Sequence, residues 1–180
     1  MIGVAAMDAM RAYRLRGSFA PGRLTVREGE VRIPYRPLME REAAEAKLAS
    51  YEDPEKLENI RKLEYAYYKE TVQVYEAGIP PHDPFFRIPQ TIVSLGDVVF
   101  IPTPFEIFSE ISLRLREYSG VPHTLALSNT NGYREYLPTE DQLCRGGYEV
   151  QCFRFGGAYS LADNADQVLI EESLRILQEK

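Results

Sequence analysis

The segment LGDVVFIPTPFEIFSEISLRLREYSGVPHTLALSNTNGYREYLPTEDQLCRGGYE, residues 95–149, decides the expected fold. Its apolar run at 98–101 is typical of a strand buried on both faces of an α/β sheet. The next residues, TPFE at 103–106, fit a helix start with Thr as the N-cap, Pro at the first position and Glu at the third. Apolar residues then recur at helical spacing until Gly120, which indicates the end of the helix. The pattern predicts one strand followed by one helix.

A loop rich in tyrosine follows a second predicted strand at 125–127. In α/β sheets with parallel strands, ligands bind beyond the carboxyl ends of the strands. Glu106 comes just after the first strand, and Tyr133 and Tyr136 come just after the second. We therefore expect the carboxylate and the two phenols to share one crevice.

Helices and strands alternate with proline- and glycine-rich loops in the rest of the chain. Asp53 and Pro54 favour a helix start, with Asp as the N-cap. Gly96 and Asp97 indicate the tight turn of an antiparallel hairpin over 88–101. The tyrosines of the predicted helix at 53–78 are expected to pack against neighbours. The expected elements are helices at 3–15, 39–50, 53–78 and 162–178, strands at 23–33 (turning near Gly29) and 88–93, and a rigid proline loop at 79–84.

Length and composition fit one globular unit covering residues 1–180, because 44% of the residues are hydrophobic and 27% are charged. A net charge of −6 and a pI of about 5.1 argue against nucleic acid as the main partner. There is no apolar run of about 18 residues, and the first residues lack the pattern of a signal peptide. We therefore expect no transmembrane segment and, by default, a cytoplasmic location.

Cysteine and histidine are scarce, with two of each. Cys144 and Cys152 cannot form a disulfide framework and are expected to be free thiols, with a single bridge as the alternative. His82 and His123 lie in no paired spacing such as HExxH or HxH. Neither histidine is therefore predicted as a metal ligand.

Three residues of the opening segment have ordinary structural interpretations. Glu106 fits a capping box, and the positive end of the helix dipole favours the ionised carboxylate that a divalent metal also requires. Tyr136 fits an aromatic that closes a turn over the sheet edge. Tyr148 fits a core residue beside Gly146 and Gly147.

Three ordered motifs, VVFIPTPFE, NGYREYLPT and GGYE, resemble the neutral/alkaline non-lysosomal ceramidase family of zinc-dependent amidases. The resemblance is close over about residues 92–148 and looser on either side. It implies that Glu106, in the Pro-x-Glu turn, and Tyr136, in the Asn-x-Tyr-x-x-Tyr segment, ligate the catalytic zinc. It also implies that Tyr148 lines the reaction centre, where its hydroxyl would donate to a developing oxyanion.

The resemblance further implies an α/β fold with a mixed sheet flanked by helices, as part of an α/β/β/α-type sandwich. The implied reaction is hydrolysis of the N-acyl amide of ceramide, or of a related amide, to a sphingoid base or other amine and a fatty acid. In that family the metal histidines and the catalytic serine come from an upstream half, the serine within a Gly-Asp-x-Ser-Pro type segment. Here Gly96 and Asp97 continue into Val-Val-Phe.

We therefore expect the chain to be the C-terminal part of such an enzyme, inactive alone, with the missing half or a second copy as its partner. Two alternatives stay open. One is a non-catalytic α/β binding or scaffold module that has lost the metal-binding half. The other is an amidase assembled from two separately encoded chains.

Overall fold

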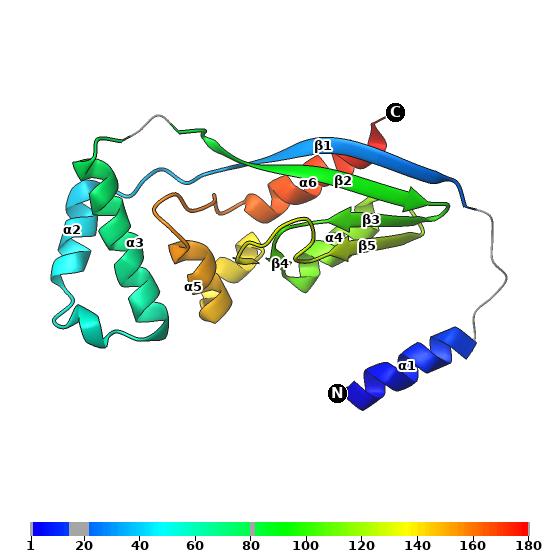
Figure 1. The fold of residues 1–180 in the computed structure, drawn as a ribbon, viewed down its shortest axis with the longest axis horizontal. Helices are drawn as coiled ribbons and strands as arrows, with labels where there is room; N and C mark the ends of the chain where they lie inside the picture. Colours follow the sequence, from blue (N-terminus) through cyan, green and yellow to red (C-terminus); the bar gives the residue numbers. More distant parts are fainter. Residues whose placement is uncertain (1, 15–21, 80–81, 180) are drawn as a thin grey trace.

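The fold is built on one mixed sheet of four strands, in the order β1-β2-β3-β5 (Figure 1). It is seen in a computed structural model that describes residues 2–14, 22–79 and 82–179. Neighbouring strands are antiparallel, except that β5 runs parallel to β3. The predicted α/β class and the predicted hairpin are confirmed. The strands are β1 (Leu24–Pro34), β2 (Phe85–Leu95), β3 (Val98–Pro102) and β5 (His123–Leu127).

The strand β1 passes through Gly29 without turning, so the turn predicted there is wrong. Its ladder with β2 is unbroken from Leu24 opposite Leu95 to Pro34 opposite Phe85. Because every residue of β1 has a partner in β2, the backbone stays extended across the glycine. The strand β1 has the predicted length and is shifted by one residue, whereas β2 is longer than the predicted strand at 88–93.

Two helices cover one face of the sheet, which we call the inner face. They are α4 (Ser109–Tyr118) and α6 (Ala165–Gln178). The helix α6 begins three residues later than predicted, because the Ala162 N–H donates to the Pro34 carbonyl (2.9 Å) and Leu161 bridges to Tyr35. The fully buried side chains between the sheet and the two helices include Val31, Ile33, Ile92, Val99, Ile101, Ile111, Leu115, Leu169 and Ile176.

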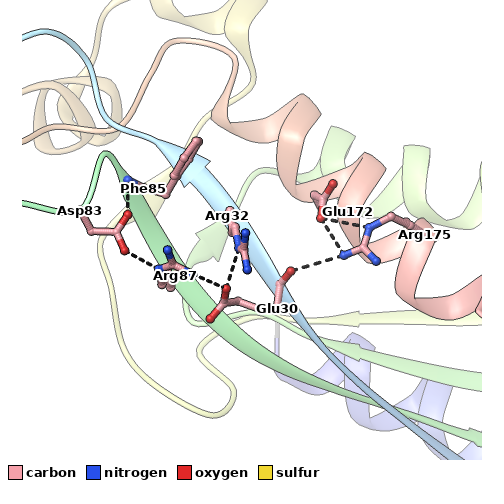
Figure 2. Close-up of polar contacts among 7 residues, drawn as sticks. All are labelled: Glu30, Arg32, Asp83, Phe85, Arg87, Glu172 and Arg175. Carbon is pink, nitrogen blue, oxygen red and sulfur yellow. Dashed lines mark hydrogen bonds and ion pairs between the residues drawn. The ribbon is translucent and has the colours of Figure 1, made fainter.

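The opposite, outer face of the sheet stays largely exposed, so the expectation of strands buried on both faces is wrong. One half of this face is apolar, and Leu24, Val26 and Leu95 are each about half exposed or more. The other half carries an ion-paired network in which Arg87 links Glu30 (2.7 Å) with Asp83 (Figure 2). We call these the apolar half and the ion-paired half.

A pair of helices is inserted between β1 and β2 and lies beyond one end of the sheet (Figure 1). Their tyrosines pack as expected; the rings of Tyr67 and Tyr68 meet Phe155 edge-on. The helix predicted over 53–78 is confirmed over Asn59–Glu76, but its predicted start is wrong. Asp53 makes no cap hydrogen bond and pairs with Lys56 instead (2.6 Å). The elements are α2 (Arg41–Ala49), a short 3-10 turn η1 (Pro54–Lys56) and α3 (Asn59–Glu76).

The first helix, α1 (Ile2–Arg14), lies apart from the sheet (Figure 1). It matches the helix predicted over residues 3–15, except that residue 15 lies outside the described residues. Residues 80–81 of the predicted proline loop also lie outside the described residues. None of the helices described has both the length and the apolar character needed to span a lipid bilayer.

Candidate functional site

Glu106 lies in a short strand and not in the first turn of a helix. The strand β4 (Glu106–Ile107) pairs in parallel with β6 (Tyr136–Leu137), so that Glu106 is directly opposite Tyr136. The helix α4 begins only at Ser109. The predicted capping box at 103–106 is therefore wrong, although the predicted proximity of Glu106 and Tyr136 is confirmed.

Backbone pairing with distant segments explains why no helix starts at 103. The Thr103 N–H donates to the Leu127 carbonyl (2.9 Å), and its hydroxyl donates to the same oxygen (3.2 Å). The Glu106 N–H donates to the Glu135 carbonyl (3.3 Å). These amides would be unpaired in the first turn of a helix, so tertiary pairing overrides the local signal.

Tyr148 lies at the start of α5 (Tyr148–Phe155), beside the β4–β6 pair. Gly146 and Gly147 both have positive φ, 68° and 101°, which lets the chain turn sharply into the helix. The Tyr148 ring meets the Tyr136 ring edge-on, with centroids 6.1 Å apart. Tyr148 is 57% exposed, so the core interpretation is wrong. The structure thus brings Glu106, Tyr136 and Tyr148 together.

A surface pocket of about 330 Å³ opens at this point. Glu106 and Tyr136 line it, whereas neither Tyr133, which is 74% exposed, nor Tyr148 is among the lining residues. Glu149 also lines it, and sequence analysis overlooked this carboxylate although it directly follows Tyr148 in the GGYE motif. The remaining lining residues are Ile107, Phe108, Ser128 and Asn129, so no lysine or arginine contributes to the wall.

The negative charge of Glu106 raises the pKa of the Tyr136 phenol above its usual value. Burial and a hydrogen bond with Glu106 act in the same direction. At neutral pH the phenol therefore keeps its proton. A divalent cation held between the two groups would oppose this effect, because it favours the phenolate.

The Tyr148 hydroxyl also keeps its proton at neutral pH. A hydrogen bond with Cys152, one turn further along α5, is the main cause of its raised pKa. Burial raises the pKa of the Cys152 thiol. Cys144 and Cys152 are both free, as predicted.

The described residues offer only part of a metal-binding site. Glu106 and Tyr136 supply two oxygen donors, whereas a catalytic zinc usually has three protein ligands. Within residues 2–14, 22–79 and 82–179, no group of three or more His, Cys, Asp or Glu residues is arranged to hold a metal. His123 pairs with Val98 at the far end of β3 and β5, and His82 packs against Tyr159 (4.2 Å between ring centroids). Glu106 and Tyr136 can therefore supply at most two of the three protein ligands that a catalytic zinc usually has.

Comparison with known proteins gives partial structural similarities. No family model and no curated protein sequence matches the chain. A crystal structure of neutral ceramidase from Pseudomonas aeruginosa aligns with a TM-score of 0.49 and 15% identity, over 87% of this chain and 28% of that one. A structure described as ceramidase complexed with C2 aligns with a TM-score of 0.42 and 14% identity, over 51% of this chain and 14% of that one. The chain thus matches less than a third of the length of either structure.

Proposed function

We propose that the chain forms the C-terminal part of a zinc-dependent amidohydrolase. The substrate would be the N-acyl amide of ceramide or a related amide, hydrolysed to an amine and a fatty acid. Glu106 and Tyr136 would hold the zinc, and Tyr148 would line the reaction centre. The observation that supports this most is the register of β4 and β6, which sets Glu106 opposite Tyr136 with Tyr148 against it.

Each of the three side chains has a chemical task that its surroundings suit. Glu106 supplies a carboxylate oxygen and Tyr136 a phenol oxygen to the metal, and both line one pocket. Bound zinc would polarise the amide carbonyl or activate a water molecule. Tyr148 is an exposed residue that keeps its proton at neutral pH, so its hydroxyl would donate to the oxyanion that develops on the carbonyl oxygen.

The remaining zinc ligands and the nucleophile would come from a further part of the enzyme. The apolar half of the outer face supports this, because Leu24, Val26 and Leu95 are exposed there on adjoining strands. Exposed apolar patches on a folded unit commonly mark a surface that packs against another chain or domain. In the proposed enzyme this face would carry the next layer of an α/β/β/α sandwich.

A non-catalytic binding or scaffold module is the second candidate function. The incomplete donor set within the described residues favours it. On this hypothesis Glu106, Tyr136 and Tyr148 would have packing roles alone, and the pocket would bind no metal.

Metal titration separates the two hypotheses. Zinc binding to the chain is measured by isothermal titration calorimetry at pH 7.5, for the natural sequence, Glu106→Gln and Tyr136→Phe. We expect weak binding by the natural chain and a loss of at least about tenfold in each variant, since removing even an outer-sphere partner of a metal ligand costs about that much. Glu140→Gln, an exposed glutamate that does not line this pocket, is the control.

Equal affinities for the natural chain and both variants would contradict the proposed ligands. The proposed reaction is tested on the full native protein that contains the chain. There Glu106→Ala is expected to abolish release of fatty acid from an N-acyl amide. An unchanged rate would leave the scaffold hypothesis.

A further inference from the structure

The apolar half of the outer face extends across all four strands of the sheet. The strand registers align Leu24 with Leu95, Val98 and His123 in one row, and Val26 with Val93, Phe100 and Leu125 in the next. Along each strand these side chains alternate with the buried residues of the inner face, so they point away from α4 and α6. Leu24 and Leu125, on the two edge strands, are 63% and 39% exposed. Solvent therefore meets an apolar surface that reaches from one edge of the sheet to the other.

The helix α1 has an exposed apolar side of its own. Met7 and Met10 are 74% and 54% exposed, and residues three apart lie on the same side of a helix. An open hollow of about 700 Å³ borders the helix, and its lining residues among those described all belong to α1. The unbranched side chain of methionine adapts to irregular apolar surfaces. The helix therefore carries a side suited to packing that has no packing partner in the arrangement of Figure 1.

The chain holds this helix close to the apolar half. The helix ends at Arg14, and the described chain resumes at Gly22, two residues before Leu24. Gly22 lies against the hairpin turn, because a methyl group built on it would be 3.0 Å from the Gly96 nitrogen. The intervening residues 15–21 allow a separation of at most about 28 Å between the two ends. A short tether of this kind gives an effective concentration in the millimolar range.

The helix and the apolar half also match in size and charge. The 13 residues of α1 make a helix about 20 Å long, and four strands about 4.8 Å apart spread over about 15 Å. The last turn of α1 carries Arg11 and Arg14, whereas Asp97, at the hairpin turn, is 66% exposed. Because the tether returns at this turn, a docked helix would bring its basic end toward Asp97.

We propose that α1 docks through Met7 and Met10 onto the apolar half of the outer face of its own chain. Figure 1 then shows the undocked arrangement, with α1 apart from the sheet. In the amidohydrolase proposed above, α1 and the next layer of the sandwich would compete for this surface, so that assembly would displace the helix. The docking itself does not rest on the proposed function, because it needs only the apolar surface and the tether.

Docking is tested by NMR with a nitroxide label on α1. The label is attached to Ala12→Cys, on the side of the helix away from the methionines, after both natural cysteines are replaced (Cys144→Ser/Cys152→Ser). Nitroxide broadens the methyl signals of nearby residues. We expect the signals of Val26 and Leu125 to lose most of their intensity, whereas methyl signals from α3, beyond the other end of the sheet, keep theirs.

Paired variants show whether the apolar side of α1 causes this loss. Met7→Lys/Met10→Lys should lower the ratio of docked to undocked helix at least about tenfold, because apolar burial drives the docking. Asp8→Lys adds a lysine to another side of the same helix and should leave the broadening unchanged. On the sheet, Val26→Lys should abolish the broadening at Leu125, whereas Glu28→Lys should not. If Val26→Lys fails to fold, the variants of α1 decide.

Two results would overturn the proposal. One is broadening that stays the same in Met7→Lys/Met10→Lys, since the tether alone would then explain it. The other is broadening that appears only in a mixture, on isotope-labelled chains without nitroxide, since α1 would then dock on a second copy. The proposed function is judged separately by zinc titration. If zinc binds but the broadening is absent, the metal site stands and the docking fails; the reverse result leaves the docking without the metal site.

Discussion

The two faces of the sheet are built from alternate residues of the same strands, yet they differ sharply. On the inner face, Ile92 and Ile101 are fully buried beneath α4 and α6. On the outer face, Val26 and Leu95 are about half exposed. Because strand side chains alternate between faces, one run of apolar residues supplies both surfaces. A continuous apolar run therefore shows that a strand is apolar, but not which face is covered.

The outer face is also divided along its length. Its apolar half lies where β1 begins and β2 ends, and its ion-paired half, with Glu30 and Arg87, lies at the other end of this ladder (Figure 2). Charged side chains at the second end keep it compatible with water, whereas the first end offers a surface for another layer. Three substitutions test how differently the faces contribute to stability.

The largest loss of stability is expected from Ile92→Ala on the inner face. Ile92 is fully buried, so the substitution leaves a cavity and should lower the free energy of unfolding by about 2–5 kcal/mol. Chemical denaturation with urea measures the loss. Its neighbour Val93, on the outer face, is the control, and Val93→Ala should cost clearly less. Equal losses would mean that the outer face is as well packed as the inner one.

A smaller loss is expected from Gly29→Ala in β1. An alanine methyl here would lie 2.6 Å from Cγ1 of Ile176, a fully buried residue of α6. Overpacking of this kind costs about 1–3 kcal/mol. Glu28→Ala, one residue away on the outer face, is the matched control and should have little effect in the same denaturation assay. No loss in Gly29→Ala would show that α6 can move away from the sheet freely.

The smallest effect is expected from Arg87→Ala in the ion-paired half. Hydrogen bonds from Arg32 and Arg87 lower the pKa of the Glu30 carboxyl, and a hydrogen bond from Arg87 lowers that of Asp83. Carboxyl groups with a lowered pKa stabilise the fold above their ordinary pKa, and this contribution is lost as the pH falls through the lowered value. All these groups are exposed, so the contribution is small.

Thermal unfolding at several pH values and salt concentrations checks this expectation. The melting temperature of Arg87→Ala should lie slightly below that of the natural chain at neutral pH and low salt. The difference should vanish in acid and at high salt, where exposed ion pairs are screened. Lys62→Ala, an exposed position on α3, is the control. A difference that persists in high salt would mean that Arg87 acts through packing of its side chain.

The sequence predicted the α/β class, the hairpin of β2 and β3 and the parallel partner β5, because apolar runs and the Gly96-Asp97 turn are local signals. It did not predict β4, because the residues TPFE carry a good helix-start signal that the chain overrides by pairing with β6. Such pairing depends on residues about thirty positions away, which no local pattern reports. For the same reason, the sequence pattern did not indicate that the outer face of the sheet is exposed.

The candidate site was also predicted only in part from the sequence. The resemblance to known motifs pointed to Glu106, Tyr136 and Tyr148, which the fold brings together, and their roles stay predictions. Glu149 was overlooked because a single carboxylate in a predicted loop is an ordinary surface feature.

The insertion of α2 and α3 between β1 and β2 has a consequence for the order in which the chain folds. Pairing Pro34 with Phe85 requires closure of the long segment between them, and the entropy cost of closure grows with segment length. Contacts between the two helices are local and form early, whereas the ladder is non-local and slow. Once the helices have paired, the two strand ends are already close and the remaining loop is short. We therefore expect pairing of α2 with α3, at the far end of the sheet, to speed formation of the ladder and of the site that the sheet supports.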